Sequence, residues 1–351
     1  MKRIFLVILL AGILFAAGCI SPEPTAPSLT QVTTLPVTAT PAAPAVPDLL
    51  GTWSGTSTGY LDLSGYEVFN DTLTMKVTGQ DGYFFTGELS FPALNGSMQT
   101  KEFAGVVGTD GKTIETIEYS GGFSDGLILS AEEIELIFRD EANPSTITID
   151  SLKRGNAAPS ISLPLMMPDL LGTWNGTFIG YRDQSGYQVF QSAITMEVTR
   201  QNGRLFTGQV SYVLNGTRTM KEFAGVIGPD GKTIETIELP DGFGNGMVVA
   251  PDEIELIFRD EANPSMIAID LFRRSTAPLA STERLTANLV GNWSGTTTGY
   301  LWNSSGYEAF TEIITMKVTG QTDRLFRGQL TFLQNGTRMT KDFAGVFDRD
   351  G

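Results

Sequence analysis

The chain has 351 residues, with 39 acidic and 24 basic side chains and a formal net charge of −15. This acidic balance argues against a nucleic-acid partner, because binding phosphates requires a basic patch. The sequence has no histidine and a single cysteine, Cys19, which excludes an intrachain disulfide, a Cys/His zinc site and a Cys–His or Ser–His catalytic pair. We therefore expect a non-enzymatic protein with no cofactor and no metal.

The amino terminus has the features of an export signal. The chain begins with two basic residues, Lys2 and Arg3, followed by an apolar run over 4–17. The small residues Ala16, Ala17 and Gly18 directly precede Cys19. The run is too short for a membrane-spanning helix, so a signal peptide is expected. The segment resembles a prokaryotic lipoprotein signal. That resemblance implies a signal peptide over 1–19, lipidation of Cys19, and anchoring on the outer face of the membrane in the cell envelope.

Residues 20–47 contain seven prolines among threonine, alanine and valine. Such a segment cannot bury enough apolar surface to fold, and we expect a disordered, extended stalk. Shorter segments rich in proline, alanine and serine, 155–168 and 275–287, are expected to be linkers.

Between these segments, one unit of about 120 residues is repeated, over 48–154, 169–274 and 288–351. Residues 101–154 and 221–274 align without a gap and match at 36 of 54 positions. A long fixed period of this kind predicts tandem domains of one fold.

Amphipathic strands and short turns follow one another through the first copy. Alternating apolar and polar residues, with turns such as Asn95-Gly96, predict eight strands. They cover Gly51–Tyr60, Tyr66–Thr78, Tyr83–Phe91, Gln99–Val107, Lys112–Tyr119, Gly126–Ser130, Glu133–Arg139 and Ser145–Lys153. The second copy repeats the pattern.

An eight-stranded meander buries one face and loses both edges when its last strand pairs with its first. We expect an all-β protein of tandem up-and-down antiparallel barrels, because short hairpins disfavour the alternative two-sheet sandwich. The interior of the first barrel is predicted to contain Phe69, Leu73, Met75, Phe85, Leu89, Phe138 and Ile147.

Gly51-X-Trp53 on the first strand, with Lys153-Arg154 ending the last, is similar to the calycin signature of lipocalins, fatty-acid-binding proteins and avidins. The resemblance implies that a base from the last strand lies over the ring of the tryptophan and closes one barrel end. The implied pairs are Trp53 with Arg154 and Trp174 with Arg274, and Trp293 is the tryptophan of the third copy. The later strands of the complete copies lack the tryptophans that avidins place around biotin, so biotin is not implied.

The third copy, 288–351, contains the first four strands only. Either the sequence is a truncated record of a longer protein or another chain completes the half-barrel.

Paired tyrosines flank the first turn of each copy. These are Tyr60 and Tyr66, Tyr181 and Tyr187, and Tyr300 and Tyr307. Two alternatives stay open: they line a ligand-binding barrel mouth, or they plug the barrel end.

Acidic residues are the other candidates for chemistry. Glu133 and Glu135 alternate with apolar residues, which predicts that they face solvent, and a calcium site at these carboxylates is the less favoured alternative. The inward face of the fifth strand is ambiguous; an inward Glu115 or Glu118 would be a polar pocket group.

These features predict a membrane-anchored surface lipoprotein whose barrels act as binding or interaction modules. The expected partners are the membrane, through the lipid anchor, and a small apolar ligand or a surface protein or glycan. The alternative is a structural or adhesive array of solid barrels.

Overall fold

The computed structural model describes residues 46–63, 65–119, 121–140, 145–155, 167–183, 186–214, 216–240, 242–260, 265–274, 287–303, 306–334 and 336–347. The predicted signal peptide and Cys19, nearly all of the stalk, and most of both linkers lie outside these residues. The described residues include no helix long and apolar enough to cross a membrane.

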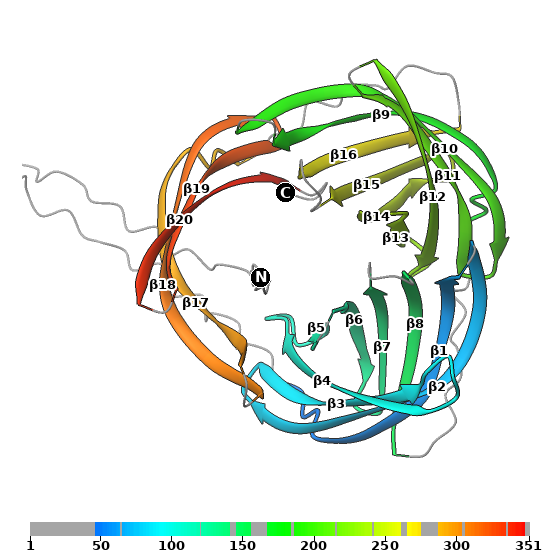
Figure 1. Cartoon of the computed structure of the whole chain (residues 1–351), viewed down its shortest axis with the longest axis vertical. Helices are drawn as coiled ribbons and strands as arrows, with labels where there is room; N and C mark the ends of the chain where they lie inside the picture. Colours follow the sequence, from blue (N-terminus) through cyan, green and yellow to red (C-terminus); the bar gives the residue numbers. More distant parts are fainter. Residues whose placement is uncertain are drawn as a thin grey trace, which may run out of the picture.

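Each of the first two copies forms a closed antiparallel barrel of eight consecutive strands (Figure 1). Barrel 1 consists of β1 (Gly51–Asp62), β2 (Tyr66–Asp81), β3 (Phe84–Pro92), β4 (Met98–Val107), β5 (Thr113–Glu118), β6 (Phe123–Ser130), β7 (Glu133–Asp140) and β8 (Thr146–Arg154). Barrel 2 consists of β9 (Gly172–Asp183), β10 (Tyr187–Asn202), β11 (Leu205–Leu214), β12 (Thr217–Ile227), β13 (Thr233–Glu238), β14 (Phe243–Ala250), β15 (Glu253–Asp260) and β16 (Met266–Arg273). The predicted fold class is confirmed.

The third copy forms a four-stranded sheet of β17 (Gly291–Asn303), β18 (Gly306–Thr322), β19 (Leu325–Gln334) and β20 (Thr337–Val346). Figure 1 shows the two barrels and this sheet arranged around a common centre.

Two glycines of β1 allow barrel 1 to close. A Cβ on Gly55 would lie 1.8 Å from the carbonyl oxygen of Ser151, and one on Gly59 would lie 2.0 Å from that of Ile147. Residues with side chains cannot approach another backbone so closely. Gly176 and Gly180 meet β16 in the same way in barrel 2.

Apolar side chains fill the tryptophan half of barrel 1. The buried set is Leu49, Trp53, Leu73, Met75, Val77, Phe85, Leu89, Phe103, Val107, Ile114, Ile134, Leu136 and Leu152. Ile147 was predicted to lie in this interior, and that prediction was wrong. Ile147 lies on the outer face of β8, in an apolar cluster with Leu205 and Ile237 of barrel 2, because the alternating strand sends its odd-numbered side chains outward.

Candidate functional site at the charged end of each barrel

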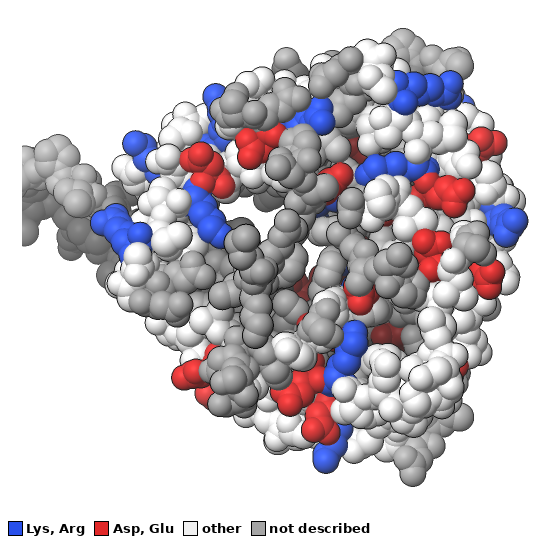
Figure 2. All heavy atoms as spheres, in the orientation of Figure 1, with Lys and Arg blue, Asp and Glu red and all other residues white. Residues whose placement is uncertain are grey.

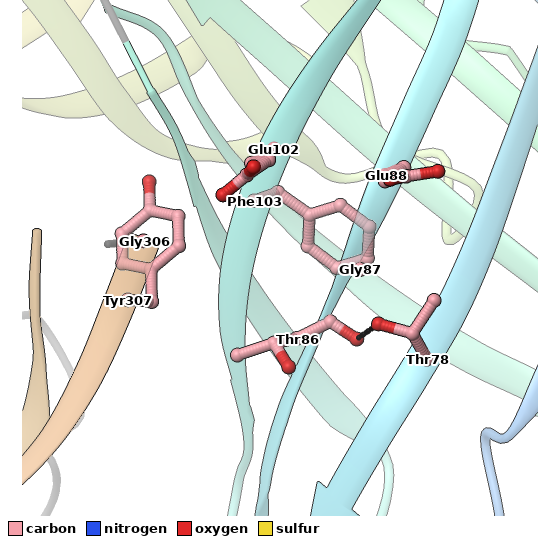
Figure 3. Close-up of a pocket in the computed structure, with 8 residues that line it drawn as sticks. All are labelled: Thr78, Thr86, Gly87, Glu88, Glu102, Phe103, Gly306 and Tyr307. Atoms are coloured by element: carbon pink, nitrogen blue, oxygen red, sulfur yellow. Dashed lines mark hydrogen bonds between the residues drawn. The ribbon is translucent and has the colours of Figure 1, made fainter. Parts of the chain in front are cut away.

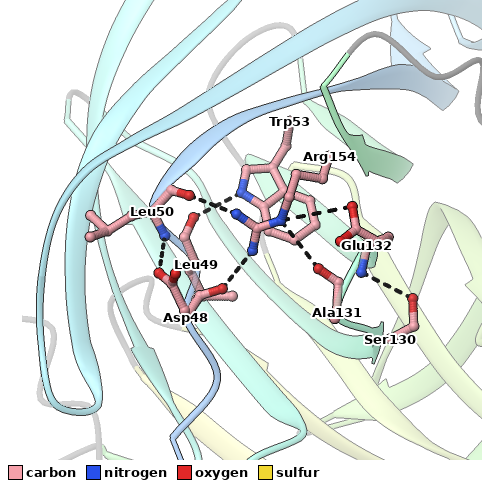
Figure 4. A network of polar contacts seen from close by, with 8 residues as sticks. All are labelled: Asp48, Leu49, Leu50, Trp53, Ser130, Ala131, Glu132 and Arg154. Carbon is pink, nitrogen blue, oxygen red and sulfur yellow. Dashed lines mark hydrogen bonds and ion pairs between the residues drawn. The ribbon is translucent and has the colours of Figure 1, made fainter.

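One end of barrel 1 is shut by a tryptophan beneath an arginine (Figure 4). Trp53 is fully buried, and its indole nitrogen donates a hydrogen bond of 2.9 Å to the carbonyl of Leu49. The guanidinium of Arg154 lies 4.4 Å from the centre of the indole ring and donates to the carbonyls of Asp48, Leu50 and Ala131. This cation–π stack therefore also fixes the segment that enters β1.

Barrel 2 repeats this closure, and the third copy repeats its indole hydrogen bond. In barrel 2 the guanidinium of Arg274 lies 4.5 Å from the ring centre of Trp174, whose indole nitrogen donates to the carbonyl of Leu170 at 2.8 Å. In the third copy, Trp293 donates to the carbonyl of Leu289 at 2.7 Å. The structure thus brings together the two tryptophan–arginine pairs that the calycin resemblance implied. Membership of the calycins stays a prediction.

Charged side chains lie inside barrel 1 towards the opposite end. Lys101 faces inward on β4, opposite the buried Leu89, and its ammonium contacts the carboxylate of Glu118 at 3.0 Å. The ammonium also lies 5.9 Å from the ring centre of Phe138. Asp150 faces inward on β8 opposite Leu136 and accepts a hydrogen bond of 2.8 Å from Thr148.

Burial changes the acidity of these groups. Desolvation raises the pKa of Glu118 to about 7, although Lys101 opposes the shift, and the charges of Asp150 and Asp140 add to it. Desolvation likewise raises the pKa of Asp150 to about 6, against hydrogen bonds from Ser57 and Thr148. The end of the barrel thus contains one ammonium and three nearby carboxyl groups.

Barrel 2 has the same four charged residues. Lys221 lies 3.6 Å from carboxylate oxygens of both Glu238 and Asp260, and Asp270 is buried on the inner face of β16. Desolvation raises the pKa of Glu238 to about 7. We call these two groups the charged quartets: Lys101, Glu118, Asp140 and Asp150 in barrel 1, and Lys221, Glu238, Asp260 and Asp270 in barrel 2.

A charged quartet provides an ammonium donor and carboxylate acceptors within a largely apolar barrel. Binding sites for small molecules typically have a few polar groups of this kind in an apolar lining. Among the described residues, no group of three or more Asp, Glu or Cys side chains is placed to hold a metal ion. The charged side chains make each quartet a candidate binding site for a polar or charged ligand.

The ambiguity on β5 is resolved by its pairing. Glu118 pairs with Phe103 on the neighbouring strand β4, and both side chains point into the barrel. Glu115 pairs with Val106, and its side chain lies on the outer face. Desolvation raises the pKa of Glu115, opposed by Arg139 and Arg259. Lys101 and Asp150 were not predicted as site residues. Their recurrence as Lys221 and Asp270, at inward positions of predicted strands, was the available signal.

The six tyrosines line neither barrel mouth. Tyr60 and Tyr66 pack against barrel 2 in one apolar cluster, and the hydroxyl of Tyr66 donates to the carbonyl of Ile237 at 3.3 Å. Tyr181 and Tyr187 pack against the third copy, through residues such as Leu325. The ring centres of Tyr300 and Phe84 are 6.0 Å apart, and the Tyr307 hydroxyl donates to the carbonyl of Ile117 at 3.2 Å. Both alternatives for these tyrosines, a ligand-binding mouth and a plug of the barrel end, are wrong, because the side chains point into the junctions between copies.

The prediction of solvent exposure for Glu135 was also wrong. Glu135 is 3% exposed and accepts two hydrogen bonds from Arg204 of barrel 2, at 2.5 and 2.8 Å. Arg324 of the third copy contacts Glu255 of barrel 2 at 2.7 Å in the equivalent place. Glu135 and Glu255 lie on the outer face of their strands, where each binds an arginine of the next copy. Strand periodicity predicts that a polar side chain lies on the outer face, but not whether water or another domain contacts it.

A hollow of about 240 Å³ lies outside barrel 1, against Gly306 and Tyr307 of the third copy (Figure 3). Its lining includes Glu88 and Glu102, which pair across β3 and β4, and both are exposed. It is separate from the charged quartets. On the face seen in Figure 2, acidic and basic side chains are interspersed.

No protein-family model matches the chain, and no curated protein matches its sequence. Among solved structures, a protein of unknown function from the DUF3598 family of Nostoc punctiforme matches with 13% identity and a TM-score of 0.28, over 65% of this chain and 96% of its own. Isotype 1 transferrin binding protein B from serogroup B Neisseria meningitidis matches with 10% identity and a TM-score of 0.23, over 84% of this chain and 76% of its own. TM-scores this low support no inference about function.

Proposed function

We propose that this protein is a lipid-anchored protein of the cell envelope whose barrels are non-enzymatic binding modules for a small polar ligand. The observation that carries the proposal is the charged quartet, present with the same residue types inside both barrels. Burying ionisable groups costs free energy unless they are paired. Two barrels that both keep a quartet with more carboxyl groups than ammonium groups favour a binding role over a purely structural one.

The lining changes the ligand class that we expect. The apolar half of barrel 1 is occupied by its own side chains around Trp53, whereas the half around Lys101 and Glu118 is charged. A polar or ionic molecule can replace the hydrogen bonds of water in that half, and an apolar one cannot. A polar ligand therefore fits better than the apolar one expected from the sequence.

The mature protein purified from its own host tests this function. Native mass spectrometry should show a small molecule retained in stoichiometric amount, and retention should fall in the double variant Lys101→Met and Lys221→Met. The matched control is Lys112→Met, on an exposed turn. Ligand-free protein that also binds nothing from a panel of cationic, anionic and neutral small molecules would contradict the proposal.

The anchor has its own test. Replacing Cys19 with serine removes the proposed lipidation site, so the protein should move from the membrane fraction to the soluble fraction of the host. Retention of the Cys19→Ser protein in the membrane fraction would contradict lipid anchoring.

A second candidate function, a rigid structural array, is favoured by the junctions. Arg204 and Glu135 form a buried bidentate pair between the barrels, and Arg139 contacts both Asp125 of its own barrel and Glu235 of barrel 2. Removing one partner of a buried pair costs about 3–5 kcal/mol. Arg204→Ala should therefore loosen the two barrels, seen as a larger radius of gyration by X-ray scattering. The exposed control Arg218→Ala should leave it unchanged.

A further inference from the structure

The two charged quartets differ in the residues that surround their last carboxyl group. In barrel 1, Asp150 is hydrogen-bonded by Ser57 and by Thr148. In barrel 2, Phe178 stands at the position of Ser57 and pairs with Asp270 between β9 and β16. Ala268 stands at the position of Thr148, and neither side chain has a hydrogen-bond donor. Barrel 2 thus keeps the acid and lacks both side chains that would satisfy it.

Asp270 is consequently a buried carboxyl group that lacks the two donors present in barrel 1. It is 4% exposed, and its Oδ1 atom has no hydrogen-bond partner among the described residues. Desolvation, with the charge of Glu238, raises its pKa well above the usual range. Burial thus favours the neutral carboxyl group, and a cation from outside the chain would stabilise the ionised form.

The ammonium of Lys221 does not meet this need. Lys221 contacts Glu238 and Asp260 at 3.6 Å each and lies 5.6 Å from the ring centre of Phe258. Two of the three carboxyl groups therefore share the one ammonium. When all three are ionised, the end of barrel 2 carries more negative than positive charge, which a cation would balance.

Aromatic rings lie beside the same acid. The ring centre of Phe178 is 5.0 Å from that of Phe190 and 5.2 Å from that of Tyr212. Desolvation raises the pKa of Tyr212 to about 12, and the charges of Glu238, Asp260 and Asp270 add to the shift. Aromatic faces attract cations, and most strongly where water is excluded.

We propose that the charged end of barrel 2 binds a small alkylammonium ion, with its charge at Asp270 and its alkyl groups against Phe178, Phe190 and Tyr212. This inference rests on the proposed binding function and names the ligand class for one barrel. Aromatic rings favour an organic cation over a metal ion, because calcium requires six to eight oxygen ligands. Lys221 and Asp260 are the most exposed members of this quartet, with side chains 11% and 14% exposed.

Barrel 1 is an internal control. Asp150 there is already hydrogen-bonded, and Ser57 takes the place of the aromatic ring of Phe178. The same ion should therefore bind barrel 2 and not barrel 1, although both have a lysine with three carboxyl groups.

The test is calorimetric titration of the whole chain with choline and with 3,3-dimethyl-1-butanol, its uncharged isostere, at constant ionic strength. We expect one saturable choline site per chain and no saturation with the alcohol. Asp270→Asn should weaken choline binding by at least about tenfold, the scale of a desolvated cation–π and ion-pair contact. Asp150→Asn should leave it unchanged, and Ala268→Thr, which restores the donor of barrel 1, should weaken it.

Each other outcome separates the two proposals. Choline binding that Asp150→Asn weakens as much as Asp270→Asn, or equal binding of the alcohol, would overturn the alkylammonium site and keep a binding function for the barrels. Saturable binding of an anion in place of choline would do the same. An absence of saturable binding with choline and with cationic, anionic and neutral probes alike would overturn both. Asparagine has the shape of aspartate, and circular dichroism of each variant checks that it is folded.

Discussion

At one end of barrel 1 Trp53 is fully buried beneath Arg154, whereas towards the other end Lys101 and Glu118 pair inside the same wall of strands. The tryptophan end is repeated closely in barrel 2, down to the carbonyl that accepts the indole hydrogen bond. The charged end keeps its four ionisable residues but changes their neighbours, with Phe178 in place of Ser57. The closed end is therefore constant between the barrels, whereas the side chains around the charged end vary.

The largest expected effect lies at the closed end. Trp53→Ala removes a fully buried indole and leaves a cavity, which should lower the free energy of unfolding by about 3–5 kcal/mol. Urea unfolding followed by circular dichroism measures it. The control Leu63→Ala, at a side chain 55% exposed, should change stability by less than about 0.5 kcal/mol. Equal effects of the two substitutions would mean that Trp53 does not close the barrel.

The pH dependence of stability reports on the charged end. Burial raises the pKa of Glu118 and Glu238 to about 7, so between the unfolded pKa of about 4.3 and pH 7 the folded protein binds more protons than the unfolded chain. The stabilising effect of protonation is therefore fully present below about pH 4.3 and is lost as the pH rises to 7, by at most about 1.4 kcal/mol per pH unit for each carboxyl group. Urea unfolding at several pH values should show this fall, and Glu118→Gln should reduce its slope. A slope of the opposite sign that Glu118→Gln leaves unchanged would contradict the assignment.

Removing the ammonium of barrel 1 should have an intermediate effect. Lys101→Met leaves Glu118 without its cation, which should cost about 1–3 kcal/mol at pH 8, where the carboxylate is ionised. At pH 5 Glu118 is protonated and the cost should shrink. The same loss at both pH values would show that Lys101 acts only through packing of its alkyl chain. Lys112→Met is the exposed control.

The smallest effect is expected at the lid of the closed end. Arg154→Leu removes the stack over Trp53 and the hydrogen bonds to the carbonyls of Asp48 and Leu50, which should cost about 1–2 kcal/mol. The free energy of unfolding measures this loss. Lys153→Leu is the neighbouring control and should cost less. A larger loss for Lys153→Leu would contradict this role of Arg154 and show that Lys153 stabilises the closed end.

Much of the fold is contained in local patterns. Alternating residues and turn signals predicted eight strands that differ from β1–β8 by three residues or fewer at their ends. The closure of the barrel followed from the meander, and Gly55 and Gly59, which make closure possible, were visible only as unexplained glycines.

The outer faces were not predictable in this way. Strand periodicity separates the two faces of a sheet but does not say what covers the outer one. Glu135 was therefore predicted to face solvent, and Tyr60 to line or to plug the barrel end, whereas both contact the next barrel. The charged quartet escaped notice because Lys101, Glu118 and Asp150 lie on different strands, and only the strand register brings them together.

The most direct test of the charged end is the titration of its carboxyl groups by carbon-13 NMR of the whole chain. We predict midpoints near pH 7 for Glu118 and Glu238. Midpoints close to the ordinary value of about 4.3 for both residues would place these carboxylates in water and contradict the account.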